Sequence, residues 1–331
     1  MHAIDSLSTK FPTALITGLK VGWRHRAKLA VRGTRLSPKI GLFKPGTHEV
    51  EDLVDCSDHH PSINKALSVI RSFSFEPYNE TTLTGALRYV QLTVERSTGL
   101  VQLVLVSNGL GACSELAAKL AKAHNFHSIW TNNQVGSTNT IFGPNWDHLF
   151  GPKYLKQNFL GTDLYFHPAC FIQAHLELFE EIVKAIKSQI LPHKHVTELY
   201  AGVGAIGLNL ASRCQSLALV EANPFAKECF LQSGPPPHLS FHTGLAESFF
   251  HLFQDVLIVD PPRKGLDRAT LEAIEHSPLQ QIIYLSCSID TLKRDLEQLK
   301  KAGWALVDAK GYHLFPNTDH VEILADLRKS G

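Results

Sequence analysis

The sequence has no long hydrophobic run. No apolar stretch approaches the roughly 18 residues that a membrane-spanning helix needs. The N-terminus, which begins Met1-His2-Ala3, lacks the basic segment and the apolar core of a secretory signal. The contents of hydrophobic residues (44%) and charged residues (19%) are ordinary for a globular chain. We therefore expect a soluble, cytoplasmic protein without a membrane partner.

Cysteine is also scarce. The six cysteines contain no C-x-x-C pair and are scattered along the chain: Cys56, Cys113, Cys170, Cys214, Cys229 and Cys287. This spacing argues against a zinc site and against an iron–sulfur cluster. A chain of 331 residues is long enough to bury a core without disulfides. We therefore predict no metal, no iron–sulfur cluster and mostly reduced thiols.

The chain as a whole has almost no excess of positive or negative charge, but its N-terminal segment is strongly basic. The net charge is +1, yet Asp5 is the single acidic residue among the first 48. Nine basic residues stand in the same segment: Lys10, Lys20, Arg24, Arg26, Lys28, Arg32, Arg35, Lys39 and Lys44. Two interpretations remain open at this point, a patch that binds a phosphate backbone and a solvated strand face.

The length of the chain predicts two packed domains. Residues 1–165 mix short strand-like runs at 27–31, 89–94 and 101–106 with a helical pattern over 114–123, which predicts an α+β domain. A polar cluster at 131–140 predicts an exposed loop. We place the domain boundary near residue 165.

Residues 166–331 instead alternate regularly between helix-like and strand-like segments. An apolar stripe predicts a helix over Phe171–Ile190. Strands are predicted over 196–200, 217–221, 239–242, 256–260 and 282–286. This alternation is typical of a doubly wound, mostly parallel sheet. The last two strands, 304–309 and 321–327, are joined by a loop too short for a crossover helix, so we expect them to pair antiparallel at one edge.

A glycine-rich turn follows the first of these strands. It contains Gly202 and Gly204, and Glu221 ends the next strand about twenty residues later. Such a turn lets the backbone approach a cofactor closely, and the carboxylate can accept hydrogen bonds from ribose hydroxyls. The pattern also satisfies the dinucleotide fingerprint, so a nicotinamide cofactor and S-adenosylmethionine both remain open at this stage.

A second motif places an acid and two cations at the end of a buried strand. Asp260 is followed by two prolines, which cannot continue a central strand, and then by Arg263 and Lys264. Ligands bind at the carboxyl edge of such sheets. The two cations suit an anionic substrate such as RNA, and the alternative is a surface turn with incidental charges.

The third motif places Cys287 at the end of the last buried strand. A helix is predicted to begin directly after it, with Ser288 or Asp290 as the N-cap. Amide dipoles at a helix N-terminus favour a thiolate, so we expect a reactive cysteine. Glu322, at the start of the final strand, would be an ordinary exposed carboxylate unless a nearby group needs a base.

Together these motifs resemble the RNA uracil-C5 methyltransferase family, and the likeness covers nearly the whole chain. The matching elements are Phe171–Gln173 (F-x-Q), Glu198–Gly204 (the glycine-rich loop), Asp260–Arg263 (D-P-P-R), Ser286–Asp295 (S-C-x-x-x-T-L-x-x-D) and His320–Glu322 (H-V-E). Upstream, Trp23–Ala27, Gly41–Phe43 and Asp55–Cys56 resemble the family's substrate-side region. His175 stands where the family usually has asparagine, so no role is transferred to it.

The resemblance implies a Rossmann-like class I methyltransferase domain over residues 166–331, preceded by an α+β RNA-substrate domain over 1–165, in the form without an N-terminal β-barrel. It implies S-adenosylmethionine as the cofactor and transfer of a methyl group to C5 of a uridine in tRNA or rRNA. Cys287 would add to C6 of uracil as the nucleophile, and Glu322 would act as the base. The implied cofactor contacts are Gln173, Tyr200, Gly202, Gly204, Glu221 and Asp260, with Arg263 and Lys264 toward the RNA. We expect a monomer.

Three other functions are compatible with parts of the pattern. A nicotinamide-dependent oxidoreductase would explain the glycines but not Asp260, Cys287 or Glu322. An RNA cytosine-C5 methyltransferase also uses a thiolate at C6, although we expect its cysteine in a different motif. A non-catalytic RNA-binding protein would explain the fold and the basic segment. It would need neither Cys287 nor Glu322, so the presence of both favours an enzyme.

Overall fold

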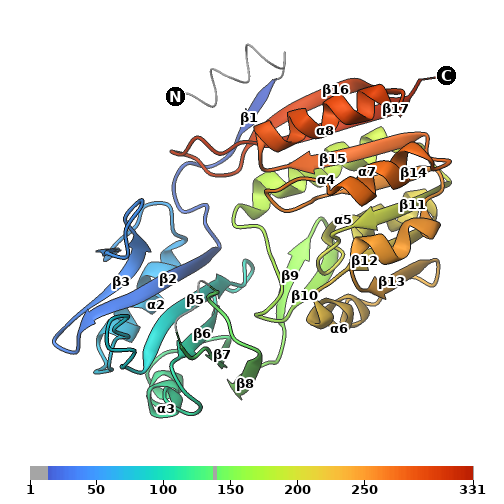
Figure 1. The fold of residues 1–331 in the computed structure, drawn as a ribbon. Coiled ribbons are helices and arrows are strands. Elements are labelled where there is room, and N and C mark those ends of the chain that lie inside the picture. Colours follow the sequence, from blue (N-terminus) through green and yellow to red (C-terminus); the bar gives the residue numbers. More distant parts are fainter. Residues whose placement is uncertain (1–13, 137–139, 331) are drawn as a thin grey trace. The chain divides into compact units, whose positions relative to one another are not determined.

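The computed structural model describes residues 14–136 and 140–330. The chain forms two compact units (Figure 1). The first in the sequence, here called the N-terminal unit, comprises residues 21–157 and 172–174. The other, here called the catalytic unit, comprises the residues up to Lys20, residues 158–171 and the chain from His175 onward. Within the described residues, no helix is both long and apolar enough to span a membrane.

The N-terminal unit is a seven-stranded sheet in the order β4-β3-β2-β5-β6-β7-β8. The strands are β2 (Arg26–Thr34), β3 (Ser37–Phe43), β4 (Val50–Asp52), β5 (Leu87–Val94), β6 (Val101–Ser107), β7 (Ser128–Asn133) and β8 (Asn145–Phe150). The helices α2 (Pro61–Arg71) and α3 (Ser114–Ala123) share one apolar core with the sheet, and Ile63, Leu67 and Leu120 are fully buried in it. The predicted strands and helix in this region are confirmed.

The loop predicted over 131–140 is wrong in its first part. Thr131 and Asn132 are buried in β7, where Thr131 pairs with Leu105 of β6. The Asn132 side chain donates to the carbonyls of Gly143 and Asn145 at 3.0 and 2.9 Å, so its polar atoms are satisfied within the unit. A polar side chain can therefore lie inside this sheet, which hydropathy alone does not indicate. Residues 137–139 lie outside the described part of the chain.

The catalytic unit is an eight-stranded sheet in the order β1-β16-β17-β15-β14-β11-β12-β13. Its strands are β1 (Leu15–Thr17), β11 (Lys194–Leu199), β12 (Cys214–Glu221), β13 (Leu239–Thr243), β14 (Val256–Val259), β15 (Gln281–Ser286), β16 (Trp304–His313) and β17 (Glu322–Lys329). The five strands from β11 to β15 pair in parallel, and β17 is antiparallel to both β15 and β16. The predicted doubly wound sheet and its antiparallel pair are confirmed.

The prediction that this antiparallel pair forms the edge is wrong. β1 pairs in parallel with β16, with Leu15 opposite Gly311, and so forms the edge itself. The paired residues Leu15 and Gly311 are 296 positions apart in the sequence, so local periodicity carries no signal of their pairing. Three residues with mixed burial are also too short to show a strand pattern.

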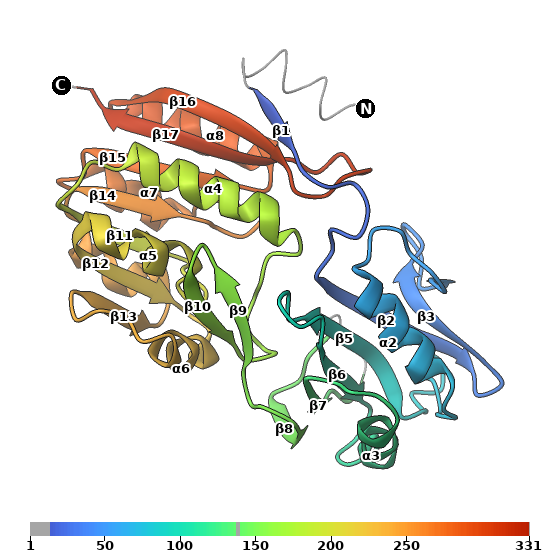
Figure 2. The same ribbon diagram turned by 180° about the vertical axis from the view of Figure 1, so that it is seen from behind.

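Helices cover the catalytic sheet (Figure 2). They are α4 (Leu176–Gln189), α5 (Ala205–Leu210), α6 (Pro224–Gln232), α7 (Arg268–Glu275) and α8 (Ile289–Lys301), with two short 3₁₀ segments, η1 (Ala211–Arg213) and η2 (Ala246–Leu252). The helix predicted from Phe171 begins only at Leu176. His175 caps it by accepting the backbone N–H of Leu178, and Phe171 is exposed outside it.

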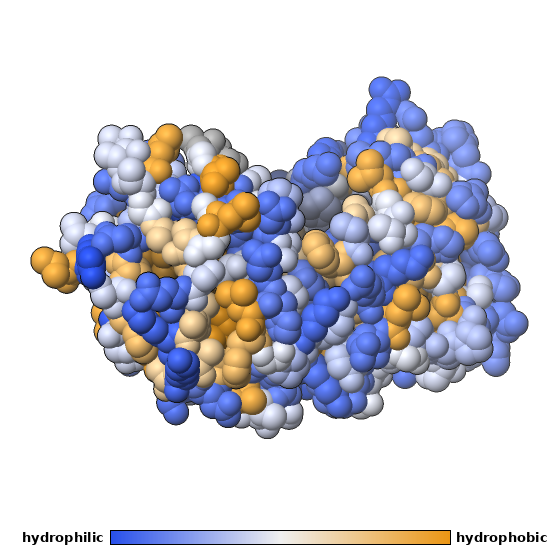
Figure 3. All heavy atoms as spheres, turned by 90° about the horizontal axis from the view of Figure 1, so that it is seen from below, coloured by the Kyte–Doolittle hydropathy of each residue, from blue (hydrophilic) through white to orange (hydrophobic). Residues whose placement is uncertain are grey.

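A hairpin of β9 (Leu155–Phe159) and β10 (Thr162–Phe166) lies where the two units meet along the sequence. β10 contacts α6 and α5 of the catalytic unit. The division between the units therefore falls after Gln157, ahead of the boundary predicted near residue 165, and Ile172–Ala174 return to the N-terminal unit. On the face drawn in Figure 3, hydrophobic residues gather in small groups among hydrophilic ones.

Candidate active site

The glycine-rich turn connects β11 to α5 through backbone conformations that favour glycine. Gly202 has φ +55° and Gly204 has φ +86°. A Cβ on Gly204 would lie 2.9 Å from Leu219 and 3.0 Å from Phe230, two fully buried side chains. A Cβ on Gly202 would meet no atom within 4 Å. Gly204 is thus required by packing, whereas Gly202 faces open space, where a ligand can approach the backbone.

Glu221 is bound directly to this turn. One carboxylate oxygen accepts the N–H of Gly202 at 2.9 Å, and the other accepts the N–H of Asn223 at 2.7 Å. The side chain is half-buried at the end of β12. These two amides hold the carboxylate beside the glycines, and each oxygen keeps a lone pair that can accept a further hydrogen bond.

Two other predicted cofactor contacts occupy different positions. Tyr200 precedes the turn with φ +60°, an unusual conformation for a residue with a bulky side chain, and its ring packs partly against the core of the catalytic unit. Burial raises the pKa of its hydroxyl. Gln173 is buried, with 8% of its surface exposed, and belongs to the N-terminal unit. Tyr200 therefore lies in the same unit as the glycine-rich turn, whereas Gln173 lies in the other unit.

Asp260 directly follows β14 and begins the segment that leads to α7. Burial raises the pKa of its carboxyl above the ordinary value. Pro261 is buried after it, and Arg263 and Lys264 are exposed, as expected for cations that face a substrate. The turn closes with a hydrogen bond from the N–H of Gly265 to the carbonyl of Pro262 at 2.8 Å.

Cys287 lies between the last residue of β15 and the first turn of α8. Ser288 is the N-cap residue, although its side chain makes no capping hydrogen bond. Ser286 Oγ donates to the carbonyl of Ser288 at 3.0 Å and accepts its N–H at 3.2 Å, so the two serines enclose the cysteine in a tight turn. Cys287 borders a cavity of about 260 Å³, which is also lined by Arg263, Ser288, Ile289, Asp290, Asp319, His320 and Val321.

The expectation of a favoured thiolate is wrong for the free protein. Burial, followed by the nearby Glu322 and Asp260 carboxyls, raises the pKa of the Cys287 thiol to about 11. Arg263 acts in the opposite direction on the same group. Burial and the two neighbouring acids thus set the direction of the shift, which the order of residues does not show.

Glu322 is buried, with 4% of its surface exposed, rather than solvated as an ordinary strand carboxylate. In the β15–β17 ladder Ser286 pairs with Ile323, so Cys287 and Glu322 continue that register on neighbouring strands. Burial raises the pKa of Glu322, the Asp260 carboxyl raises it further, and Arg263 lowers it. The site therefore combines a thiol, two carboxyls that resist ionisation and one cation.

Sequence reasoning assigned no role to two buried acids, Glu198 and Asp295. Glu198 is 3% exposed in β11, and burial raises its pKa to about 8. Asp295 is fully buried in α8 and accepts a hydrogen bond from the hydroxyl of Tyr284 at 2.8 Å. Both stand within recognised motifs, but their burial is visible only in the fold. Among the described residues, no group of three or more His, Cys, Asp or Glu side chains is arranged to hold a metal.

The basic N-terminal segment divides between internal contacts and the surface. Arg26 is buried and donates to Gln91 at 2.8 Å, and Arg32 pairs with Glu80. Lys28 and Lys39 are exposed in the same sheet. Part of the positive charge thus serves the unit's own structure, while part is accessible. Lys10 and Asp5 lie outside the described residues.

Comparisons with known proteins show the family and the fold of the chain. A model of the family described as tRNA (Uracil-5-)-methyltransferase matches residues 247–329. The crystal structure of Pyrococcus abyssi tRNA (uracil-54, C5)-methyltransferase in complex with S-adenosyl-L-homocysteine superposes with a TM-score of 0.83 at 21% identity, covering 98% of this chain and 81% of that one. This superposition shows that the fold is that of the class I methyltransferases.

Two curated relatives extend the likeness to the sequence. An uncharacterized RNA methyltransferase of Protochlamydia amoebophila (strain UWE25) is 41% identical, covering 98% of this chain and 90% of the relative. Another, of Nostoc sp. (strain PCC 7120), is 29% identical, covering 95% of this chain and 72% of the relative. The chain belongs to the RNA uracil-C5 methyltransferase family.

Proposed function

We propose that this protein transfers a methyl group from S-adenosylmethionine to C5 of a uridine in tRNA or rRNA, through a covalent bond between Cys287 and C6 of the uracil. One observation carries the proposal. A thiol and a buried carboxyl, Cys287 and Glu322, stand at the same end of adjacent strands, and Cys287 lines a cavity of about 260 Å³.

The residues around the glycine-rich turn fit the adenosine part of the cofactor. Gly202 faces open space, and the Glu221 carboxylate beside it has lone pairs left for ribose hydroxyls. Gly204, Tyr200, Asp260 and Gln173 complete the proposed set of contacts. When bound, S-adenosylmethionine would supply an electrophilic methyl group. The Pyrococcus abyssi relative with the same fold is described in complex with S-adenosyl-L-homocysteine.

The roles of the protein's own groups follow from uracil chemistry. Carbon C5 is a poor nucleophile, but addition of the Cys287 thiolate at C6 places a pair of electrons on the C4 carbonyl and C5. The methyl group that C5 gains would leave S-adenosylhomocysteine as the other product, and the ionised carboxylate of Glu322 then accepts the proton of C5. The electrons of that C–H bond form the C5–C6 double bond again, and the C6–sulfur bond breaks to release the thiolate. Arg263 stabilises negative charge at both protein groups.

The target base must leave its stack to reach this cavity. C5 and C6 are covered by stacking inside a helix, so the uridine is expected in a loop or flipped out of one. Arg263 and Lys264 are exposed and can contact phosphates, and Arg263 also lines the cavity. We assign the RNA-substrate role to the N-terminal unit, whose exposed Lys28 and Lys39 suit a polyanion.

The test is release of tritium from RNA that carries 5-tritiated uridine. Total tRNA and total rRNA are assayed separately, with and without S-adenosylmethionine, for the native protein and for Cys287→Ala. Release that depends on the cofactor and disappears in the variant would support the proposal and identify the RNA class. Normal release by Cys287→Ala would refute the covalent mechanism. No release from either RNA would point to cytosine as the substrate or to an RNA-binding role without catalysis.

A further inference from the structure

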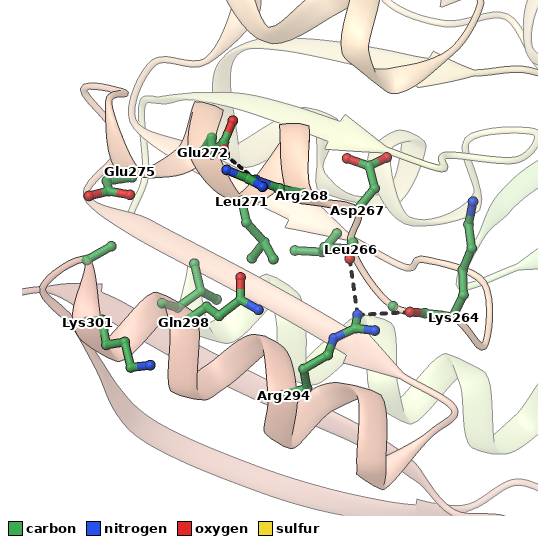
Figure 4. Close-up of a pocket in the computed structure, with 13 residues that line it drawn as sticks. Lys264, Leu266, Asp267, Arg268, Leu271, Glu272, Glu275, Arg294, Gln298 and Lys301 are labelled. Atoms are coloured by element: carbon green, nitrogen blue, oxygen red, sulfur yellow. Dashed lines mark hydrogen bonds and ion pairs between the residues drawn. The ribbon is translucent and has the colours of Figure 1, made fainter.

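Helix α8 holds the loop that carries Arg263, through two side chains that have no role in the proposed reaction. A groove of about 780 Å³ lies between α7, α8 and this loop (Figure 4). Arg294, from α8, reaches across one end of the groove. Its guanidinium donates to the backbone carbonyls of Lys264 at 2.9 Å and of Leu266 at 3.1 Å.

Asp295, the next residue of α8, completes the contact from inside the protein. One carboxylate oxygen accepts the N–H of Leu266 and the hydroxyl of Tyr284, each at 2.8 Å. The other accepts the guanidinium of Arg294 at 2.9 and 2.7 Å. The Asp295 side chain is fully buried, so each of these hydrogen bonds is costly to break without a replacement.

The loop approaches this pair too closely for any residue but glycine. Gly265 has φ +73°, and a Cβ there would lie 2.6 Å from the Asp295 carboxylate and 2.7 Å from the Arg294 guanidinium. Arg263 stands two residues before Gly265, and Pro261 and Pro262 stiffen the other side of the loop. The path of the loop, and hence the position of Arg263, is defined by these contacts.

Helix α8 also defines the position of the nucleophile. It begins at Ile289, immediately after Cys287 and Ser288, and Asp295 lies about two turns further along. A rigid helix therefore connects the turn that contains Cys287 with the side chains that hold the Arg263 loop. Any movement of the loop relative to Cys287 requires these hydrogen bonds to break.

We propose that Arg294 and Asp295 are positioning residues, which hold the cation of Arg263 beside Cys287 for the reaction proposed above. Neither side chain lines the cavity at Cys287. Both act through the backbone of residues 264–266. This role rests on the proposed function. The contacts themselves are present in the protein without RNA or cofactor.

The consequence for the thiol follows from the charges around it. Glu322 of β17 and Asp260 after β14 raise the pKa of Cys287, while Arg263 lowers it. Asp290, Asp319 and His320 also line the cavity. If the Arg263 guanidinium leaves its position, the carboxyls near Cys287 remain without a cation. The pKa of the thiol then rises, and a smaller fraction of Cys287 is thiolate.

The experiment measures alkylation of Cys287 by iodoacetamide against pH, with the Cys287 peptide quantified by mass spectrometry. It needs neither RNA nor cofactor, so it stands apart from any failure of the proposed function. We expect Arg294→Gln to shift the pH midpoint upward by roughly 0.5–1 unit, which slows alkylation at neutral pH about three- to tenfold. Arg263→Gln should give the same shift. The double variant should shift no further, because both changes remove the same cation.

The matched control is Arg268→Gln, which removes an exposed cation from the opposite wall of the groove, where it pairs with Glu272. It should leave the alkylation profile unchanged. A shift in Arg294→Gln no larger than in this control would overturn the proposal, as would shifts that add in the double variant. If Arg294→Gln does not fold, Arg294→Lys keeps the charge and a donor and should show a smaller shift of the same sign.

Discussion

The Glu221 carboxylate accepts the backbone N–H of Gly202 at 2.9 Å, so the acid at the end of β12 is joined directly to the glycine turn after β11. The two residues come from neighbouring parallel strands, whose carboxyl ends meet at one edge of the sheet. This contact turns two separate sequence signals into one binding surface for the proposed cofactor.

Replacement of Glu221 by glutamine should therefore weaken cofactor binding. The amide keeps one acceptor but loses the charge that strengthens its hydrogen bonds, so we expect roughly tenfold weaker binding of S-adenosylhomocysteine. Isothermal titration calorimetry measures the change. Glu297→Gln, an exposed carboxylate on α8, is the control and should bind like the native protein. Equal affinity of both variants would show that Glu221 does not contact the ligand.

Alanine at Gly202 should mainly impair cofactor binding, whereas alanine at Gly204 should mainly impair stability. The methyl group of Gly202→Ala meets no neighbouring atom, so the positive φ is the only source of destabilisation, and we expect a loss of about 1–2 kcal/mol of unfolding free energy. The same methyl group should obstruct the cofactor. Gly204→Ala also meets the buried Leu219 and Phe230 and should lose about 2–4 kcal/mol.

Urea unfolding and calorimetric titration separate these two effects. A Gly202→Ala variant that binds S-adenosylhomocysteine normally would contradict an approach of the ligand to this backbone. A Gly204→Ala variant as stable as the native protein would contradict the packing role of that glycine.

Glutamine at position 322 should stop the reaction after methyl transfer. Its amide cannot take the proton from C5, so the bond between Cys287 and the uracil should persist. A protein–RNA adduct that survives denaturing electrophoresis should accumulate in Glu322→Gln, and tritium release should fall by at least about a hundredfold. Adding Cys287→Ala should abolish the adduct. Rapid tritium release by Glu322→Gln would assign the base to another group.

Glu198 should make the folded protein less stable as the pH rises. Burial raises its folded-state pKa to about 8, above the ordinary value of 4.5. Between these values the unfolded chain has lost the proton while the folded chain keeps it, so stability is highest below pH 4.5 and declines up to pH 8. Asp260 and Glu322, whose pKa values are also raised, act in the same direction.

The change Glu198→Gln isolates this contribution. Relative to the native protein, the variant should gain roughly 1–3 kcal/mol of unfolding free energy between pH 5 and pH 8, measured by urea unfolding. Glu247→Gln, an exposed carboxylate in η2, serves as the matched substitution. The same pH dependence in all three proteins would show that the Glu198 carboxyl does not carry the effect.

Much of the fold follows from local patterns. The strands that form the parallel sheet were predicted because buried apolar runs alternate with amphipathic helices. The start of α4 was misplaced because Phe171 and Ile172 continue the apolar spacing of the helix, although His175 caps it. The edge strand β1 was missed because its partner β16 lies at the opposite end of the chain.

The sequence by itself determined which chemical groups are present at the strand ends: the glycine turn, Glu221, Asp260, Cys287 and Glu322. It could do so because strand ends and turn residues carry local signals. Only the tertiary structure decided the protonation of those groups and the position of Arg263. Burial, the distance between carboxyls and the hydrogen bonds of Asp295 arise from segments far apart in the chain. A pKa and a loop position depend on such neighbours in space, and the order of residues along the chain does not specify them.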